Sequence, residues 1–100
     1  MKQDFAISPE ALRRQAAVAR DHGRAQLAAN FERGAELTAL SEAMIFEIYE
    51  LLRPGRAESA TQLVNFAVKL REHHDAPHVA ALIEEAALVY ERRKLFRKRY

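Results

Sequence analysis

Apolar side chains recur at intervals of three and four residues along most of this chain, and this period constrains the fold more than any other feature. Residues at such intervals share one side of an α-helix. The chain has only three Gly and three Pro among 100 residues, which leaves little room for the turns of an all-β fold. The sequence therefore predicts an all-α fold. An example with the spacing i, i+3, i+4 and i+7 is Leu63, Phe66, Ala67 and Leu70.

Capping residues divide this pattern into five predicted helices. Ser8, Ser41 and Ser59 can each begin a helix, because a serine oxygen accepts a hydrogen bond from a free backbone N–H of the first turn. Gln62 can complete a capping box by reaching back toward Ser59. Pro77 can open the last helix, since the first helical position needs no N–H donor. The first predicted helix begins at Ser8-Pro9 and is followed by Gly23, and the second runs from about Arg24 to Thr38. The third begins near Ser41 and ends at the turn 53–56, the fourth begins at the Ser59 capping box and ends at the break 73–77, and the last runs from Pro77 into the basic C-terminal tail.

Glycine and proline mark the predicted helix ends, with one exception. Gly23 and Gly55 follow predicted helices, and Pro54 disfavours helical geometry at Arg53. Gly34 instead lies inside the second predicted helix, where it costs about 1 kcal/mol relative to Ala. One explanation for Gly34 is the close approach of another helix.

The connection lengths and the composition limit the architectures that the chain can adopt. Connections of two to six residues favour antiparallel neighbours in a compact bundle, so we expect one helical domain over 1–100, with a polar arm at 1–7. No apolar run is long enough to span a bilayer, so no membrane association is expected. The chain has no cysteine and no secretion signal, which together favour a cytoplasmic location.

The basic charge is concentrated at the C-terminus. Residues 92–100 hold six basic side chains and no acid, whereas residues 1–91 hold ten basic and fourteen acidic ones. A protein that binds nucleic acid across a face usually has a basic body as well. We therefore rank a solvated or protein-docking tail above a nucleic-acid-binding one.

The histidines do not form a convincing metal site. His74 and His78 have the i, i+4 spacing that can hold a metal on a helix, but Pro77 falls between them. A solvated helix end is the better interpretation of these side chains and of His73. His22 precedes Gly23 at a predicted helix end, where a cation suits the helix dipole.

The acids and serines also point away from catalysis. Glu84 and Glu85 are adjacent on a helix and so diverge by about 100°. Glu32 and Glu36 share a face, but surface solvation explains them better than acid–base work. The three capping serines lie in no nucleophile motif, and no glycine-rich phosphate loop occurs. We predict no catalytic, cofactor-binding or metal-binding residue in this chain.

Four segments, in this order and spacing, resemble the small (γ) subunit of adenosylcobalamin-dependent diol and glycerol dehydratases. The LRPGR sequence after EIYELL and the EEAALVYERRK sequence carry the most weight. The resemblance covers about residues 7–95. The matching segments are ISPEALRRQA at 7–16, GRAQLAANFERGAEL at 23–37, IFEIYELLRPGR at 45–56 and VAALIEEAALVYERRK at 79–94.

This resemblance implies a supporting role in a larger enzyme. The family converts glycerol or propane-1,2-diol to an aldehyde by radical chemistry that adenosylcobalamin initiates. The large subunit is a TIM barrel holding substrate, and the cofactor lies between the large and medium subunits. The small subunit is helical, packs on the large one and supplies no catalytic residue, in a dimer of αβγ trimers. Some family members carry a longer N-terminal segment that directs packaging into a microcompartment; only six residues precede Ile7 here, which disfavours packaging by that route.

Five residues are candidates for the subunit interface. Arginine makes bidentate bonds across interfaces, and tyrosine is enriched there. The alternative for each is that it covers an end of the chain's own bundle. A different function also stays open, that of a small nucleic-acid-binding or adaptor protein acting through the tail. In addition, an isolated small subunit can self-associate through an exposed apolar patch. The candidates are Tyr49, Arg53, Arg56, Tyr90 and Arg93.

Overall fold

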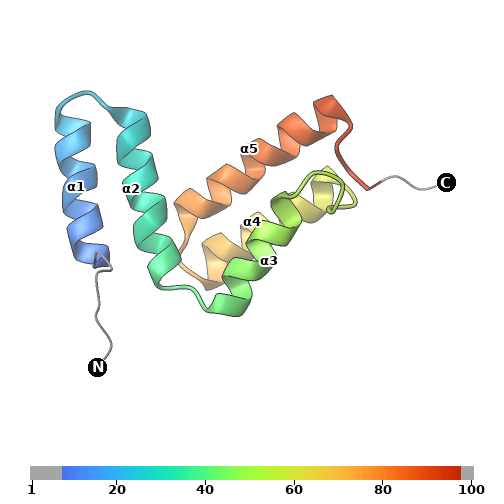
Figure 1. Ribbon diagram of the computed structural model, residues 1–100, viewed down its shortest axis with the longest axis horizontal. Helices are drawn as coiled ribbons and strands as arrows, with labels where there is room; N and C mark the ends of the chain where they lie inside the picture. Colours follow the sequence, from blue (N-terminus) through green and yellow to red (C-terminus); the bar gives the residue numbers. More distant parts are fainter. Residues whose placement is uncertain (1–7, 98–100) are drawn as a thin grey trace. The chain divides into compact units, whose positions relative to one another are not determined.

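A computed structural model describes residues 8–97 of the chain. These residues form five α-helices, and no strand occurs among them (Figure 1). The all-α prediction with five helices is confirmed over this range. The predicted arm at 1–7 and the last three residues of the basic tail lie outside the described residues. The helices are α1 (Pro9–Asp21), α2 (Ala25–Thr38), α3 (Glu42–Leu52), α4 (Ala60–His73) and α5 (Pro77–Arg93).

The serines begin the helices as predicted. The Oγ atoms of Ser8, Ser41 and Ser59 each accept a hydrogen bond from the backbone N–H three residues ahead, at 3.1, 3.1 and 3.2 Å. The capping box at α4 differs in one detail from the expectation. The Gln62 side chain accepts from the N–H of Glu58 at 2.7 Å, one residue before the cap, because the chain enters α4 in an extended conformation.

Left-handed backbone conformations terminate helices and turns. Gly23 and Gly55 have φ of +74° and +84°, which glycine adopts without a steric penalty. Lys94 also has a positive φ, +58°, and its N–H bonds back to carbonyls of α5. The last helix therefore extends into the basic tail through Arg92 and Arg93 and ends there.

The chain divides into two compact units, 1–39 and 40–100. In the first unit α1 and α2 form an antiparallel pair (Figure 1). Small side chains fill the space between them, with Phe31 packed against the buried Ala16, Ala19 and Ala28. The expectation of a single domain stays a prediction.

Gly34 faces α1 within this first unit. A Cβ atom added at Gly34 would lie 3.5 Å from Cδ1 of Leu12, which is an ordinary van der Waals contact. The helix approach suggested by the sequence is thus present, but it leaves room for a methyl group. The structure therefore gives no steric reason for glycine at this position.

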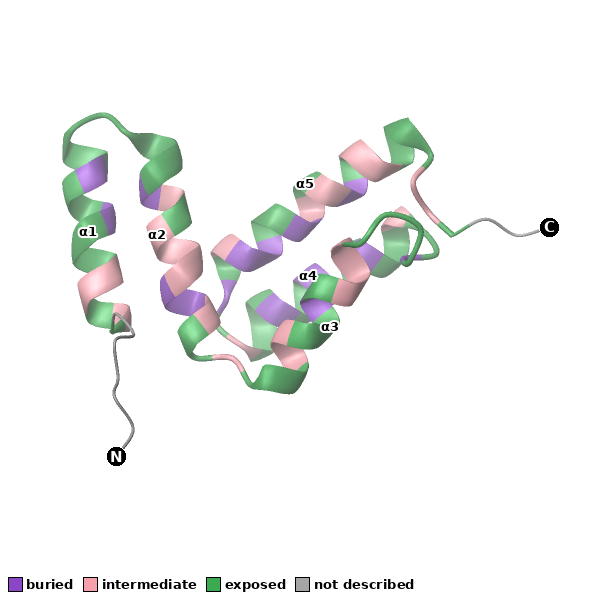
Figure 2. Cartoon of the chain, in the orientation of Figure 1, coloured by how far each residue is buried: buried purple, intermediate pink, exposed green. Residues whose placement is uncertain are grey.

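The second unit contains the larger core. Helices α4 and α5 lie antiparallel, and their buried faces meet (Figure 2). Across this pair, the Arg71 guanidinium donates two hydrogen bonds to the Glu84 carboxylate, at 2.7 and 2.9 Å. The largest fully buried side chains within residues 8–97 all belong to these two helices and are Leu63, Leu70, Val79 and Ile83.

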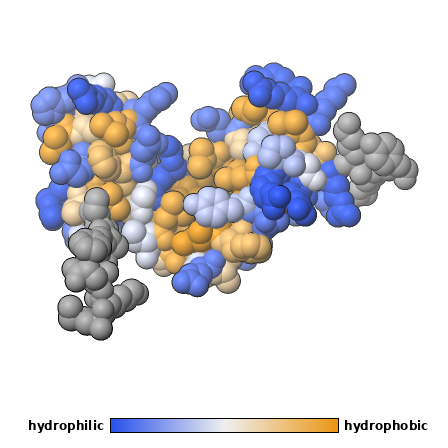
Figure 3. All heavy atoms as spheres, viewed as in Figure 1, coloured by the Kyte–Doolittle hydropathy of each residue, from blue (hydrophilic) through white to orange (hydrophobic). Residues whose placement is uncertain are grey.

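Several large apolar side chains remain exposed. Phe46 and Tyr49 of α3 are 66% and 62% exposed, and Leu88 of α5 is 69% exposed. In Figure 3 hydrophobic side chains gather over α3. No helix of the described residues is both long enough and apolar enough to cross a membrane.

Candidate docking surface

The residues that could carry chemistry lie at helix ends. His73 is the last residue of α4, His74 caps that helix, and His78 lies in the first turn of α5. His22 caps α1, with its Nδ1 atom 2.9 Å from the carbonyl oxygen of Val18. Within residues 8–97, no group of three or more His, Asp or Glu side chains is placed to hold a metal ion. The chain's lack of a metal or catalytic site stays a prediction.

One acid is placed differently from the expectation. Glu36 of α2 is only 7% exposed, whereas the sequence analysis assigned it to the solvated surface. It is not without an interaction, and no buried side-chain nitrogen or oxygen among the described residues lacks a hydrogen bond. Glu36 is buried together with Ala28 and Ala35 of the same helix.

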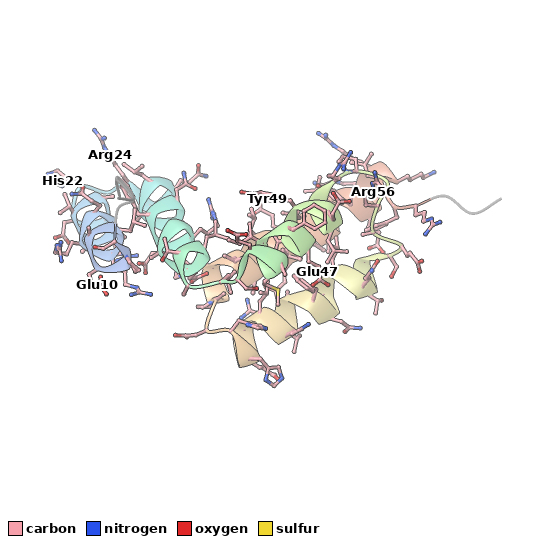
Figure 4. All side chains as sticks on the ribbon, turned by 60° about the horizontal axis from the view of Figure 1, so that its bottom comes forward. Glu10, His22, Arg24, Glu47, Tyr49 and Arg56 are labelled. Carbon is pink, nitrogen blue, oxygen red and sulfur yellow. The ribbon has the colours of Figure 1, made fainter. Side chains whose placement is uncertain are left out.

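The predicted interface arginines follow α3 and share one carboxylate. Arg53 caps α3 and lies 3.1 Å from Glu50, and Arg56 lies 3.9 Å from the other oxygen of Glu50. Both arginine side chains are more than half exposed. Tyr49 projects from α3 and Arg56 lies on the turn that follows it (Figure 4).

Tyr90 has a role inside the fold. Its hydroxyl donates a hydrogen bond to the carbonyl oxygen of Leu52, the last residue of α3. Its ring meets Phe96 edge to face, with centroids 6.2 Å apart. These contacts support the alternative that the sequence left open for Tyr90, in which the side chain covers an end of its own helices.

Two backbone hydrogen bonds hold the turn after α3 beside the segment after α5. Gly55 N–H donates to Leu95 at 2.6 Å, and Arg97 N–H donates to the carbonyl of Ala57 at 2.7 Å. The paired residues are about 40 positions apart in the sequence, and helical periodicity does not predict such a contact. The turn sequence Arg53-Pro54-Gly55 indicated a reversal but not its partner.

An open groove of about 540 Å³ lies along this pairing, and we call it the basic groove. Among the described residues, Arg93 and Lys94 supply its charged lining and no acid contributes to it. Of the five predicted interface residues, the structure places Arg93 in the groove and Tyr49 outside it. The residues lining the basic groove are Pro54, Gly55, Arg93, Lys94, Leu95 and Phe96.

Comparison with known proteins decides the family. A family model described as "Dehydratase small subunit" matches residues 1–97. The chain belongs to the dehydratase small subunit family. The comparisons offer no support for a nucleic-acid-binding or adaptor protein.

Two curated relatives of this chain are both named propanediol dehydratase small subunit. They come from Citrobacter freundii and Salmonella typhimurium (strain LT2), and each is 49% identical over 94 residues. The match covers 93% of this chain and 54% of each relative. The chain therefore spans about half the length of the curated relatives it matches.

Two hollows occur among the described residues, and the basic groove is one of them. A second hollow, of about 320 Å³, lies between α1 and α2 and is lined in part by Val18, Leu27 and Phe31. His22 and Arg24 lie at its rim, at the turn that joins the two helices (Figure 4). Both hollows are open and within the lower half of the range for small-molecule sites, about 300–1,000 Å³. Neither fits a group as large as a corrin cofactor.

Proposed function

We propose that this chain is a non-catalytic small subunit of a coenzyme-B12-dependent diol or glycerol dehydratase, which packs on and supports the large catalytic subunit. The observation that carries the proposal is the family match over residues 1–97, together with 49% identity to two propanediol dehydratase small subunits. The resemblance found in the sequence points to the same role.

The placement of the polar side chains supports a structural contribution. Serines at the helix starts serve as caps, and histidines lie at helix ends. In such an assembly adenosylcobalamin supplies the radical chemistry, and we propose that the large and medium subunits hold it. We further propose an assembly of two αβγ trimers in the cytoplasm.

The substrate is part of the same proposal. The family resemblance is compatible with glycerol and with propane-1,2-diol. The name of the two relatives favours propane-1,2-diol. Since the proposed small subunit contributes no residue to the reaction, this choice would depend on the large subunit.

Co-purification tests the proposal. An affinity tag on this chain, co-expressed with the large and medium subunits of a propanediol dehydratase, is expected to retain both subunits through gel filtration. The isolated chain is expected to bind no cobalamin and to dehydrate neither diol. Recovery of the tagged chain without the other subunits, at micromolar concentrations of all three, would overturn the proposal.

A further inference from the structure

The basic groove is built by contacts that fix both of its walls. The bonds Gly55 to Leu95 and Arg97 to Ala57 hold the two backbone segments together. The edge-to-face contact of Phe96 with Tyr90, and the bond from Tyr90 to Leu52, anchor the segment after α5 to α3. The groove therefore belongs to the folded second unit.

The groove carries unbalanced positive charge. Arg93 and Lys94 line it, and within residues 8–97 neither forms an ion pair. Around it, Arg53 and Arg56 share the single carboxylate of Glu50. The two chain segments that form the groove, 50–58 and 91–97, hold six basic side chains and three acidic ones. These are Arg53, Arg56, Arg92, Arg93, Lys94 and Arg97 against Glu50, Glu58 and Glu91.

The helix dipole accounts for only part of this charge. Cations in the last turn of α5 are stabilised by its C-terminal carbonyls, which applies to Arg92 and Arg93. Lys94 and Arg97 lie beyond the helix, and Arg97 contacts Glu58 only at 3.9 Å. Unpaired cations beside an apolar surface complement a segment that presents carboxylates, because charge-assisted hydrogen bonds are stronger than neutral ones.

We propose that the basic groove docks an acidic segment of a partner dehydratase subunit, with its carboxylates on Arg93 and Lys94 and an apolar side chain against Pro54 and Phe96. This rests on the proposed function and names where and by what chemistry the subunit binds. RNA fits the groove less well, since single strands bind on open aromatic platforms. Phe96 is half-buried and already packed against Tyr90.

Charge reversal in the assembled enzyme tests the proposal. Arg93→Glu with Lys94→Glu is expected to weaken binding of the full chain to the large and medium subunits about tenfold or more, with a reduced dependence on salt. Arg13→Glu with Arg14→Glu makes the same charge change on the exposed side of α1 and is expected to change the affinity less than twofold. If the first variant has lost helicity by circular dichroism, Arg93→Gln with Lys94→Gln replaces it. Equal affinities for wild type and the groove variants would overturn the proposal.

A peptide probe separates this proposal from the proposed function. A fluorescent deca-glutamate peptide is expected to bind the isolated full chain at low salt, and the groove variant is expected to lose that binding. No deca-glutamate binding, or tighter binding of a deca-uridine RNA at the same salt, would overturn the groove proposal even if the subunits co-purify. Groove-dependent binding of deca-glutamate without any subunit complex would support the groove chemistry and contradict the proposed function.

Discussion

The Tyr90 hydroxyl donates a hydrogen bond to the backbone carbonyl of Leu52, and this bond joins α5 to the end of α3. The last carbonyls of a helix have no partner within the helix, so a side chain from elsewhere must satisfy them when they are shielded from water. The same Tyr90 ring contacts Phe96. One side chain thus links α3, α5 and the segment that follows α5.

Removal of this hydroxyl is expected to destabilise the protein. Tyr90→Phe keeps the ring but leaves the Leu52 carbonyl without its donor, which costs about 1 kcal/mol in the free energy of unfolding. Urea denaturation followed by circular dichroism measures the change. Tyr49→Phe is the matched control, because Tyr49 is 62% exposed, and it is expected to have almost no effect. Equal stabilities of Tyr90→Phe and Tyr49→Phe would show that the bond contributes nothing.

Substitution of Gly34 by alanine is expected to stabilise the protein. Gly34→Ala places a methyl group at 3.5 Å from Leu12, within ordinary contact distance, and improves helix propensity in α2. The free energy of unfolding should rise by about 1 kcal/mol. Gly23→Ala is the control, because a φ of +74° strains any side chain, and it should lower stability. A destabilised Gly34→Ala protein would mean that α1 and α2 approach more closely than described.

Helix starts were the part of the fold that the sequence predicted best. A capping serine acts within four residues, so Ser41 or Ser59 followed by an apolar helical pattern contains nearly all the information needed. Gly23 and Pro77 act equally locally. The helix end at Lys94 was missed, because a left-handed lysine has no distinctive sequence signal.

The candidate surface depended on contacts that are distant in the sequence. Arg93 was selected from its residue type alone, but the groove that it lines depends on the bond from Gly55 to Leu95, and helical periodicity does not indicate such a pairing. Tyr90 was selected for the same reason and instead bonds Leu52. Glu36 was assigned to the surface because a charged residue is rarely buried.

The ion pair between α4 and α5 gives a pH dependence with a defined sign. Hydrogen bonds from Arg71 lower the pKa of Glu84 below its ordinary value of 4.5. A lowered pKa in the folded state contributes stability that is present above the ordinary value and is lost as the pH falls through the lowered one. The melting temperature of wild type should therefore exceed that of Glu84→Gln at pH 7, and the gap should close below pH 4.5.

The neighbouring acid is the control for this measurement. Glu85 is exposed and has no ion pair in the described structure, so Glu85→Gln should track wild type over the same pH range. Surface ion pairs contribute little, and added salt should reduce the difference between wild type and Glu84→Gln. A gap that widens on acidification would contradict the assigned direction of the pKa.

The core of the second unit should dominate stability. Leu70 is fully buried, and Leu70→Ala is expected to cost about 2–5 kcal/mol through lost burial and the cavity that remains. Leu88→Ala removes the same atoms from a side chain that is 69% exposed, so its cost should stay below about 1 kcal/mol. Both values come from urea denaturation of the full chain, and similar costs for the two variants would show that α4 and α5 do not pack as described.

Diol turnover by the reconstituted enzyme tests the central claim most directly. Purified large and medium subunits with adenosylcobalamin are titrated with this chain, and aldehyde formation from propane-1,2-diol is measured. The account predicts no aldehyde from this chain alone, and activity that rises with added chain to a plateau at equal stoichiometry. Turnover by this chain alone, or activity of the large and medium subunits that does not change when it is added, would contradict the account.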